Sequence, residues 1–152
     1  MGIHDHSSAL LVGIDCYEKK HITPLRGAKN DARTLVSTLT DHLGFPPERV
    51  RSLTDGEAEI SEFGIALENA AGQTSSESLL LLFFAGHGFR LAGTKDDYLV
   101  FYDSDIRNKT NRKRTCFPVA HLEKVLCSSA AHRVLVLLDA CRKPVEKGRS
   151  VE

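Results

Sequence analysis

Three short, unbroken apolar runs stand out along the chain. They cover residues 9–14, 79–84 and 134–138, and polar residues or glycines bound each of them. Runs of this length without polar alternation are typical of strands buried on both faces, as in a parallel sheet covered by helices. Two weaker candidate strands lie at residues 50–53 and 98–102.

The segments between these runs have helical spacing. Apolar residues recur every three or four positions in 28–43, 60–71 and 118–126, which predicts three amphipathic helices. Gly44 ends the first of them, and Pro118 opens the third. Strands that alternate with helices predict an α/β layer fold with right-handed crossovers.

One strongly basic segment, residues 103–115, has no such pattern and is predicted to be a loop. Two interpretations stay open for it, a solvated surface loop and a protease-sensitive or anion-binding loop. Its basic residues are Arg107, Lys109, Arg112, Lys113 and Arg114.

Composition narrows the classes of protein and of partner. A chain of 152 residues with 41% hydrophobic residues is long enough for one domain with its own core. The formal net charge is zero, which gives no reason to expect nucleic acid or an anionic membrane as a partner. No apolar run approaches the ~20 residues that span a bilayer.

The ends of the chain and its cysteines bear on localisation. The N-terminus lacks a basic region followed by an apolar one, so no signal peptide is expected. The four cysteines include no C-x-x-C pair. Their number and spacing fit a protein of a reducing compartment. The expected location is the cytoplasm.

Chemically active residues follow the strong strands. Ligands of open α/β sheets bind beyond the carboxyl ends of the strands. His87 follows the second strong run, and Cys141 follows the third. The two are therefore predicted to project from the same edge of the sheet.

A cysteine beside an imidazole is a nucleophile for acyl transfer. His87 would take the proton of Cys141 and later protonate a leaving amine. The amides of Gly88 and Cys141 would stabilise the oxyanion. Taken singly, such a cysteine is more often a small core residue and such a histidine more often structural. Their joint placement favours catalysis.

Together, these residues and the motifs around them make the chain resemble a known family. It is similar to the large-subunit part of caspase-like cysteine peptidases, in the branch of metacaspases and bacterial caspase homologues. In that family the histidine lies about 50 residues before the cysteine. The resemblance rests on five blocks, which are residues 9–15, 25–32, 83–88, 97–100 and 136–141.

The resemblance implies roles for individual residues. It assigns the catalytic dyad to His87 and Cys141, and a pocket for a substrate Arg or Lys to Asp31 and Asp139. Caspases that cut after Asp have an arginine at the position of Leu25. This chain departs from metacaspases in two places, because Ala28 replaces a cysteine and Arg142 replaces a histidine.

The resemblance also implies an architecture. Residues 1–142 correspond to a caspase-like large subunit (p20-like) in a three-layer sandwich with a mainly parallel sheet. Residues 143–152 correspond to a polar tail or inter-subunit linker, where Lys143, Lys147 and Arg149 offer sites for self-processing. The expected partners are a small-subunit (p10-like) chain or segment, a protein substrate and another copy of the chain. Pathways of stress, cell death or defence are implied.

No resident metal or cofactor is predicted. Some metacaspases bind activating calcium through aspartates, and Asp97, Asp103 and Asp105 are candidate oxygen ligands here. The simpler interpretation is that these are solvated loop acids.

Two other functions remain alternatives. The first is a catalytically silent, caspase-like interaction module, which the lack of a small subunit favours. The second is a flavodoxin-like domain that binds nucleotide or phosphate. The acidic segment from Asp15 to Glu18, where such a domain needs a phosphate loop, argues against it.

Overall fold

The computed structural model describes residues 4–140 and 144–145. Its centre is a four-stranded sheet in the order β2-β1-β3-β7, and every neighbouring pair in it is parallel. The strong apolar runs form β1 (Ser8–Gly13), β3 (Leu79–Gly86) and β7 (Arg133–Ala140), and the weaker run at 50–53 forms β2 (Val50–Thr54). The predicted parallel sheet is confirmed.

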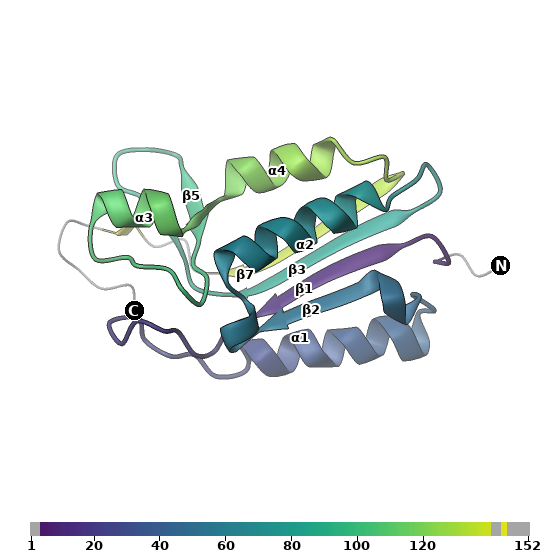
Figure 1. Cartoon of the computed structure of the whole chain (residues 1–152), viewed down its shortest axis with the longest axis horizontal. Helices are drawn as coiled ribbons and strands as arrows, with labels where there is room; N and C mark the ends of the chain where they lie inside the picture. Colours follow the sequence, from purple (N-terminus) through teal and green to yellow (C-terminus); the bar gives the residue numbers. More distant parts are fainter. Residues whose placement is uncertain (1–3, 141–143, 146–152) are drawn as a thin grey trace.

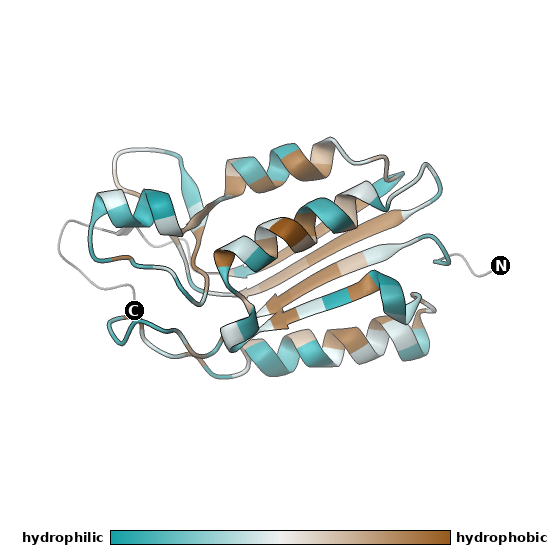
Figure 2. Cartoon of the chain, in the orientation of Figure 1, coloured by the Kyte–Doolittle hydropathy of each residue, from teal (hydrophilic) through white to brown (hydrophobic). Residues whose placement is uncertain are grey.

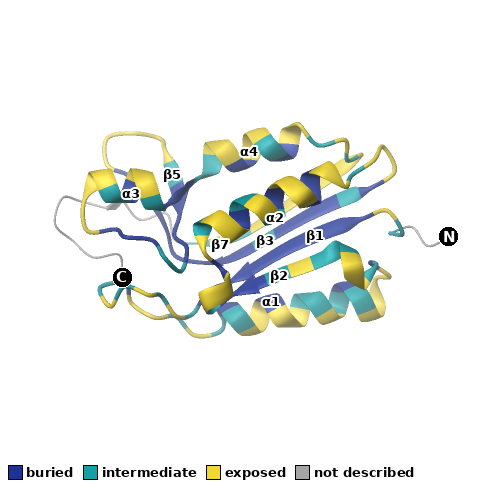
Figure 3. Ribbon diagram, in the orientation of Figure 1, coloured by how far each residue is buried: buried dark blue, intermediate teal, exposed yellow. Residues whose placement is uncertain are grey.

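Helices cover both faces of this sheet (Figure 1). One face packs against α1 (Ala28–Ser37), through a cluster that includes Leu11 and Ala32. The other packs against α2 (Ile60–Gly72) and α4 (Val119–Cys127). In Figures 2 and 3 the strands β1 and β3 are apolar and buried, while the helices turn polar, exposed residues outward. The predicted three-layer α/β fold is confirmed.

The first helix ends differently from the prediction. Its α-helical part stops at Ser37, and a π-helical turn over Thr38–His42 continues it. Gly44 then takes a φ of +73°, a conformation that glycine adopts without steric cost. The predicted span of 28–43 therefore matches the helical segment but not its hydrogen bonding.

A second, smaller sheet lies beyond the carboxyl ends of the main strands (Figure 1). Its order is β6-β5-β4-β8. The candidate strand at 98–102 is shorter than predicted and belongs to this sheet. The strands are β4 (Gly88–Leu91), β5 (Asp97–Leu99), β6 (Phe117–Pro118) and β8 (Pro144–Val145). Two residues of the predicted tail therefore pair with β4, in parallel.

The loop predicted for residues 103–115 is wrong in its second half. Helix α3 (Lys109–Thr115) forms there, with the Asn108 side chain accepting a hydrogen bond from the Asn111 amide at 2.9 Å. Arg112 is buried, and its Nε donates to the Ile106 carbonyl at 2.6 Å. The sequence pattern missed this helix because its buried residue is an arginine rather than an apolar residue.

One edge of the main sheet is apolar and open. Residues Val134, Leu135, Val136 and Leu137 of β7 are 41, 43, 39 and 41% exposed. Within the described residues, β7 pairs only with β3 in this sheet. Among the described residues, no helix is both long enough and apolar enough to span a bilayer.

Candidate active site

The register of the sheet brings the strand ends together. Gly86 pairs with Ala140, and Gly13 pairs with Ala85. His87 and Cys141 come next in the sequence after Gly86 and Ala140. Cys141 itself lies outside the described residues, so the structure places His87 but not its predicted partner.

A pocket of about 390 Å³ opens at this edge, and it brings three predicted residues together. Asp31 reaches it from the first turn of α1, His87 from the end of β3, and Asp139 from the end of β7. Both aspartates are exposed to solvent. The remaining lining residues are Leu25, Arg26, Ala28, Ala85 and Gly86.

His87 is buried at this edge, with only 2% of its surface exposed. Its Nε2 lies 2.7 Å from the main-chain oxygen of Thr23. A carbonyl oxygen only accepts hydrogen bonds, so Nε2 carries the proton in this contact. That leaves Nδ1 as the nitrogen that can accept a proton from a thiol.

A second residue of the same segment also holds His87. The hydroxyl oxygen of Tyr17 accepts a hydrogen bond from the His87 amide at 2.9 Å, and the two rings lie 5.2 Å apart. Sequence reasoning missed both Tyr17 and Thr23. A main-chain oxygen carries no sequence signal, and the tyrosine had no motif to mark it.

Two aspartates fix the segment that carries these residues. The Asp15 carboxylate accepts hydrogen bonds from the amides of Ala28 and Lys29, at 2.9 and 3.3 Å. The Asp55 carboxylate accepts from the amides of Asp15 and Cys16, at 2.9 and 3.1 Å, and pairs with Lys29 Nζ at 3.0 Å. Burial acts to raise the pKa of Asp55, but these hydrogen bonds outweigh it and hold that pKa below its ordinary value. The segment is thus anchored to both β2 and α1.

Gly88, the predicted oxyanion donor, is the first residue of β4. His87 O accepts from Val100 N at 2.9 Å, and Leu91 N donates to Asp96 O at 2.9 Å. Hydrogen bonding along an antiparallel strand alternates from side to side, so the Gly88 amide faces away from β5. Gly88 also shares a small cavity with Ala140, the residue before Cys141.

The acids considered as calcium ligands each meet a donor of the protein. Asp97 forms a two-bonded ion pair with Arg90, and Asp103 accepts from the Ile60 amide at 3.0 Å. Asp105 is bound by Arg107, whose hydrogen bonds hold its pKa well below the usual range. Across residues 4–140 and 144–145, no group of three or more His, Cys, Asp or Glu side chains could hold a metal ion.

The thiols that the structure describes lie apart from this pocket. Cys16 and Cys127 are exposed, and Cys116 is buried. Burial raises the pKa of Cys116 to about 11, so this thiol stays protonated near neutral pH and is a poor nucleophile. None of the three lines the pocket that contains His87.

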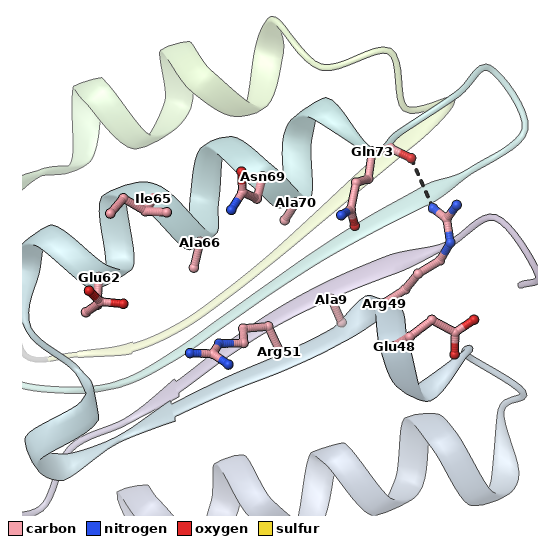
Figure 4. Close-up of a pocket in the computed structure, with 10 residues that line it drawn as sticks. All are labelled: Ala9, Glu48, Arg49, Arg51, Glu62, Ile65, Ala66, Asn69, Ala70 and Gln73. Carbon is pink, nitrogen blue, oxygen red and sulfur yellow. Dashed lines mark hydrogen bonds between the residues drawn. The ribbon is translucent and has the colours of Figure 1, made fainter.

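A second hollow, of about 260 Å³, lies between α2 and the outer edge of β2 (Figure 4). Its rim carries Glu48, Arg51 and Glu62, and Arg49 reaches across it to donate to the Gln73 carbonyl at 3.0 Å. Among the residues that the structure describes, neither a histidine nor a cysteine lines it. The charges on its rim are of both signs, and its described lining offers no nucleophile or imidazole. The pocket at His87 is therefore the better candidate for catalysis.

A three-layer α/β domain with a buried histidine and two acids at the carboxyl edge of its sheet has the features of a caspase-like domain. The caspase domain family model matches residues 6–152. The chain therefore belongs to the caspase domain family, and the predicted resemblance is confirmed at that level.

Two further comparisons bear on this chain, one through its sequence and one through its fold. Metacaspase-1 of Candida glabrata is 29% identical over an alignment of 111 residues, and the match covers 66% of this chain and 28% of that protein. A crystal structure of a Geobacter sulfurreducens protein superposes with a TM-score of 0.72 and 21% identity, over 89% of this chain and 50% of that one. The chain thus spans half or less of these relatives, and the structural match bears on the fold alone.

Proposed function

We propose that this chain carries the catalytic dyad of a cysteine endopeptidase that cleaves proteins after Arg or Lys. One observation carries the proposal. The pocket at the carboxyl edge of the sheet joins Asp31, His87 and Asp139, three residues from three separate elements, in a member of the caspase domain family. An imidazole and two carboxylates in one pocket suit a cationic substrate side chain near a reacting bond.

The reaction begins with proton transfer from Cys141 to His87 Nδ1. The thiolate attacks the carbonyl carbon of the scissile peptide, and the C=O electron pair moves onto oxygen. When the intermediate collapses, the C–N bond breaks and His87 gives the proton to the leaving amine. The acyl-enzyme is then hydrolysed by water that His87 deprotonates. The contact between Nε2 and Thr23 supports this assignment, because it leaves Nδ1 for the thiol.

The amides of Gly88 and Cys141 would hold the oxyanion. The direction of the Gly88 amide, away from β5, supports its role. Loss of one such donor typically lowers kcat by about 100- to 1000-fold.

Asp31 and Asp139 would bind the cation of the substrate residue before the cut. Both are exposed acids of the pocket, and a charge-assisted hydrogen bond to a guanidinium is strong where the substrate excludes water. Arg26 also lines the pocket and would repel the substrate cation, so the proposal requires that the two carboxylates together outweigh this one positive charge.

The partner is proposed to be a small-subunit (p10-like) chain or segment beside β7. The open, apolar β7 strand supports this, because unpaired strand edges recruit a further strand. We further propose that cleavage in the basic tail, at Lys143, Lys147 or Arg149, matures the enzyme within a cytoplasmic stress, death or defence response. Another copy of the chain is the alternative partner.

The specificity is tested with the assembled enzyme and peptides that carry Arg, Lys or Asp before the scissile bond. Arg and Lys peptides should be cleaved, and Asp peptides should not. Asp31→Asn and Asp139→Asn should each lower kcat/KM for Arg peptides about 100-fold, because a charged partner is removed from the pocket. Asp41→Asn, an exposed acid of the π-helical turn outside the pocket, is the matched control.

Efficient cleavage after Asp would overturn the proposed specificity. Absence of any peptidase activity in the assembled protein, with Cys141 no more reactive than Cys127, would instead favour a catalytically silent interaction module.

A further inference from the structure

The segment between β1 and α1 carries an aromatic residue, Tyr17, that contacts His87 of the candidate site. Tyr17 packs on the main core and also on the smaller cluster that contains Phe89 and Val100. It therefore lies where the two sheets of the domain meet. The proposed catalytic steps assign it no role.

Tyr17 contacts both the main chain and the ring of His87. Its Oη accepts the hydrogen bond from the His87 amide at 2.9 Å, and the ring centroids lie 5.2 Å apart at 41°. Burial raises the pKa of Tyr17 well above its ordinary value, so the phenol is a neutral acceptor throughout the physiological range. Thr23, six residues further on in the same segment, accepts from the imidazole Nε2 at 2.7 Å. One segment thus fixes the residue at two points.

The preceding residue shows how closely the tyrosine fits. A Cβ atom at Gly86 would lie 3.0 Å from Tyr17 Oη, and 3.1 Å from the ring of Phe84. A side chain at this position would make unusually tight contacts, so the tyrosine hydroxyl or the Phe84 ring would have to move by a few tenths of an ångström. The end of β3 and the Tyr17 hydroxyl are therefore closely packed.

The segment that carries Tyr17 is held independently of His87. Asp55 binds the amides of Asp15 and Cys16, and the Glu18 amide donates to the Tyr102 carbonyl at 3.0 Å. Asp55 takes a φ of +46° to do so, a conformation that non-glycine residues seldom adopt and that often accompanies functional sites. Tyr17 is thus a fixed support rather than a side chain that follows the histidine.

We infer that Tyr17 is a positioning residue that holds His87 with Nε2 on Thr23 and Nδ1 directed at the reacting thiol. The inference rests on the proposed role of His87 as the acid–base group. Tyr17 touches no reacting atom in this scheme. It acts only by restricting the main chain and the ring plane of His87.

The test compares Tyr17→Phe and Tyr17→Leu with the unmodified full chain. Tyr98→Phe is the control, because Tyr98 is a buried tyrosine of the same small cluster that Tyr17 packs against, but it stacks on Phe89 at 5.3 Å rather than on His87. The first readout is the ¹⁵N-detected imidazole N–H signal of His87, assigned by its absence in His87→Asn. The second is the division of the effect between kcat and KM in the assembled enzyme.

The inference predicts graded losses. Tyr17→Phe keeps the ring and loses the acceptor, so kcat should fall about tenfold with KM changed less than twofold, and the N–H signal should broaden. Tyr17→Leu loses both contacts and should reduce kcat at least 100-fold and abolish the signal. Tyr98→Phe should leave both readouts as in the unmodified chain, even where its melting temperature falls.

The outcomes separate this inference from the proposed function. An unchanged N–H signal and unchanged kcat in both Tyr17 variants would overturn the inference while peptidase activity stands. A signal that responds to Tyr17 in a protein without peptidase activity would support the positioning contact and overturn the proposed function. Equal loss of the signal in Tyr98→Phe would reduce Tyr17 to a general structural role and overturn the inference.

Discussion

The imidazole Nε2 of His87 lies 2.7 Å from the main-chain oxygen of Thr23. Since the carbonyl can only accept, this contact selects the tautomer in which Nδ1 has a free lone pair. The donor comes from the end of β3 and the acceptor from the segment between β1 and α1, two parts of the chain that only folding brings together. The contact places a proton-accepting nitrogen at the edge where Cys141 follows β7.

The dyad is tested by removing each member. His87→Ala and Cys141→Ala should each reduce peptide cleavage at least 1000-fold in the assembled enzyme, because neither residue can be replaced by the other in the acyl-transfer steps. Cys127→Ala, which removes an exposed thiol outside the pocket, should retain full activity. Turnover by either dyad variant at the unmodified rate would contradict the mechanism. Circular dichroism checks that the fold is kept.

The apolar β7 edge should make the chain associate when no partner covers it. Sedimentation of the chain alone should show mass increasing with concentration, and Leu135→Lys with Leu137→Lys should suppress that increase. Ile65→Lys is the control, because Ile65 is 56% exposed but lies on α2. A monomer that is fully active by itself at every concentration would show that β7 needs no partner.

Gly13 should not tolerate a side chain. A Cβ there would lie 2.3 Å from the Ala28 carbonyl oxygen and 2.8 Å from Ala32 Cβ, so α1 would have to move away from the sheet. Gly13→Ala should lower the free energy of unfolding by roughly 1–3 kcal/mol. Gly64→Ala, inside α2 with nothing within 4 Å, should raise it by roughly 0.4–1 kcal/mol. Urea unfolding measures both, and equal effects of the two changes would show that the approach of α1 to β1 is not as close as described.

Asp105 should give the fold a pH dependence on the acid side. The hydrogen bonds from Arg107 lower the pKa of Asp105 in the folded chain, so the folded state holds fewer protons than the unfolded one. The resulting stabilisation is complete above the ordinary carboxyl pKa of about 4 and disappears as the pH falls through the lower folded value. Asp105→Asn should therefore be less stable than the unmodified chain at pH 7, and the difference should shrink below about pH 4.

The measurement is the urea midpoint at pH 7, 4 and 3 for both proteins. Arg107→Gln, which removes the partner but keeps Asp105, should reproduce the loss at pH 7. A stability difference that stays the same at all three values would show that the charge of Asp105 does not contribute.

Apolar runs predicted the parallel sheet well, because strands buried on both faces exclude polar residues along their whole length. The same criterion failed for α3. Its seven residues, Lys109–Thr115, are polar or charged, and the buried Arg112 satisfies its Nε through the Ile106 carbonyl. A pattern that counts apolar positions does not register a helix anchored by an arginine.

The sequence by itself determined the layers of this protein and the edge of the sheet at which the candidate site lies, since the buried strands and the residues after each strand follow from local patterns. It also named Asp31, His87 and Asp139, which line one pocket. Only the tertiary structure decided what surrounds the histidine. Tyr17 and Thr23 act through a hydroxyl and a main-chain oxygen from a distant segment, and such contacts depend on where the chain returns in space rather than on any periodic pattern.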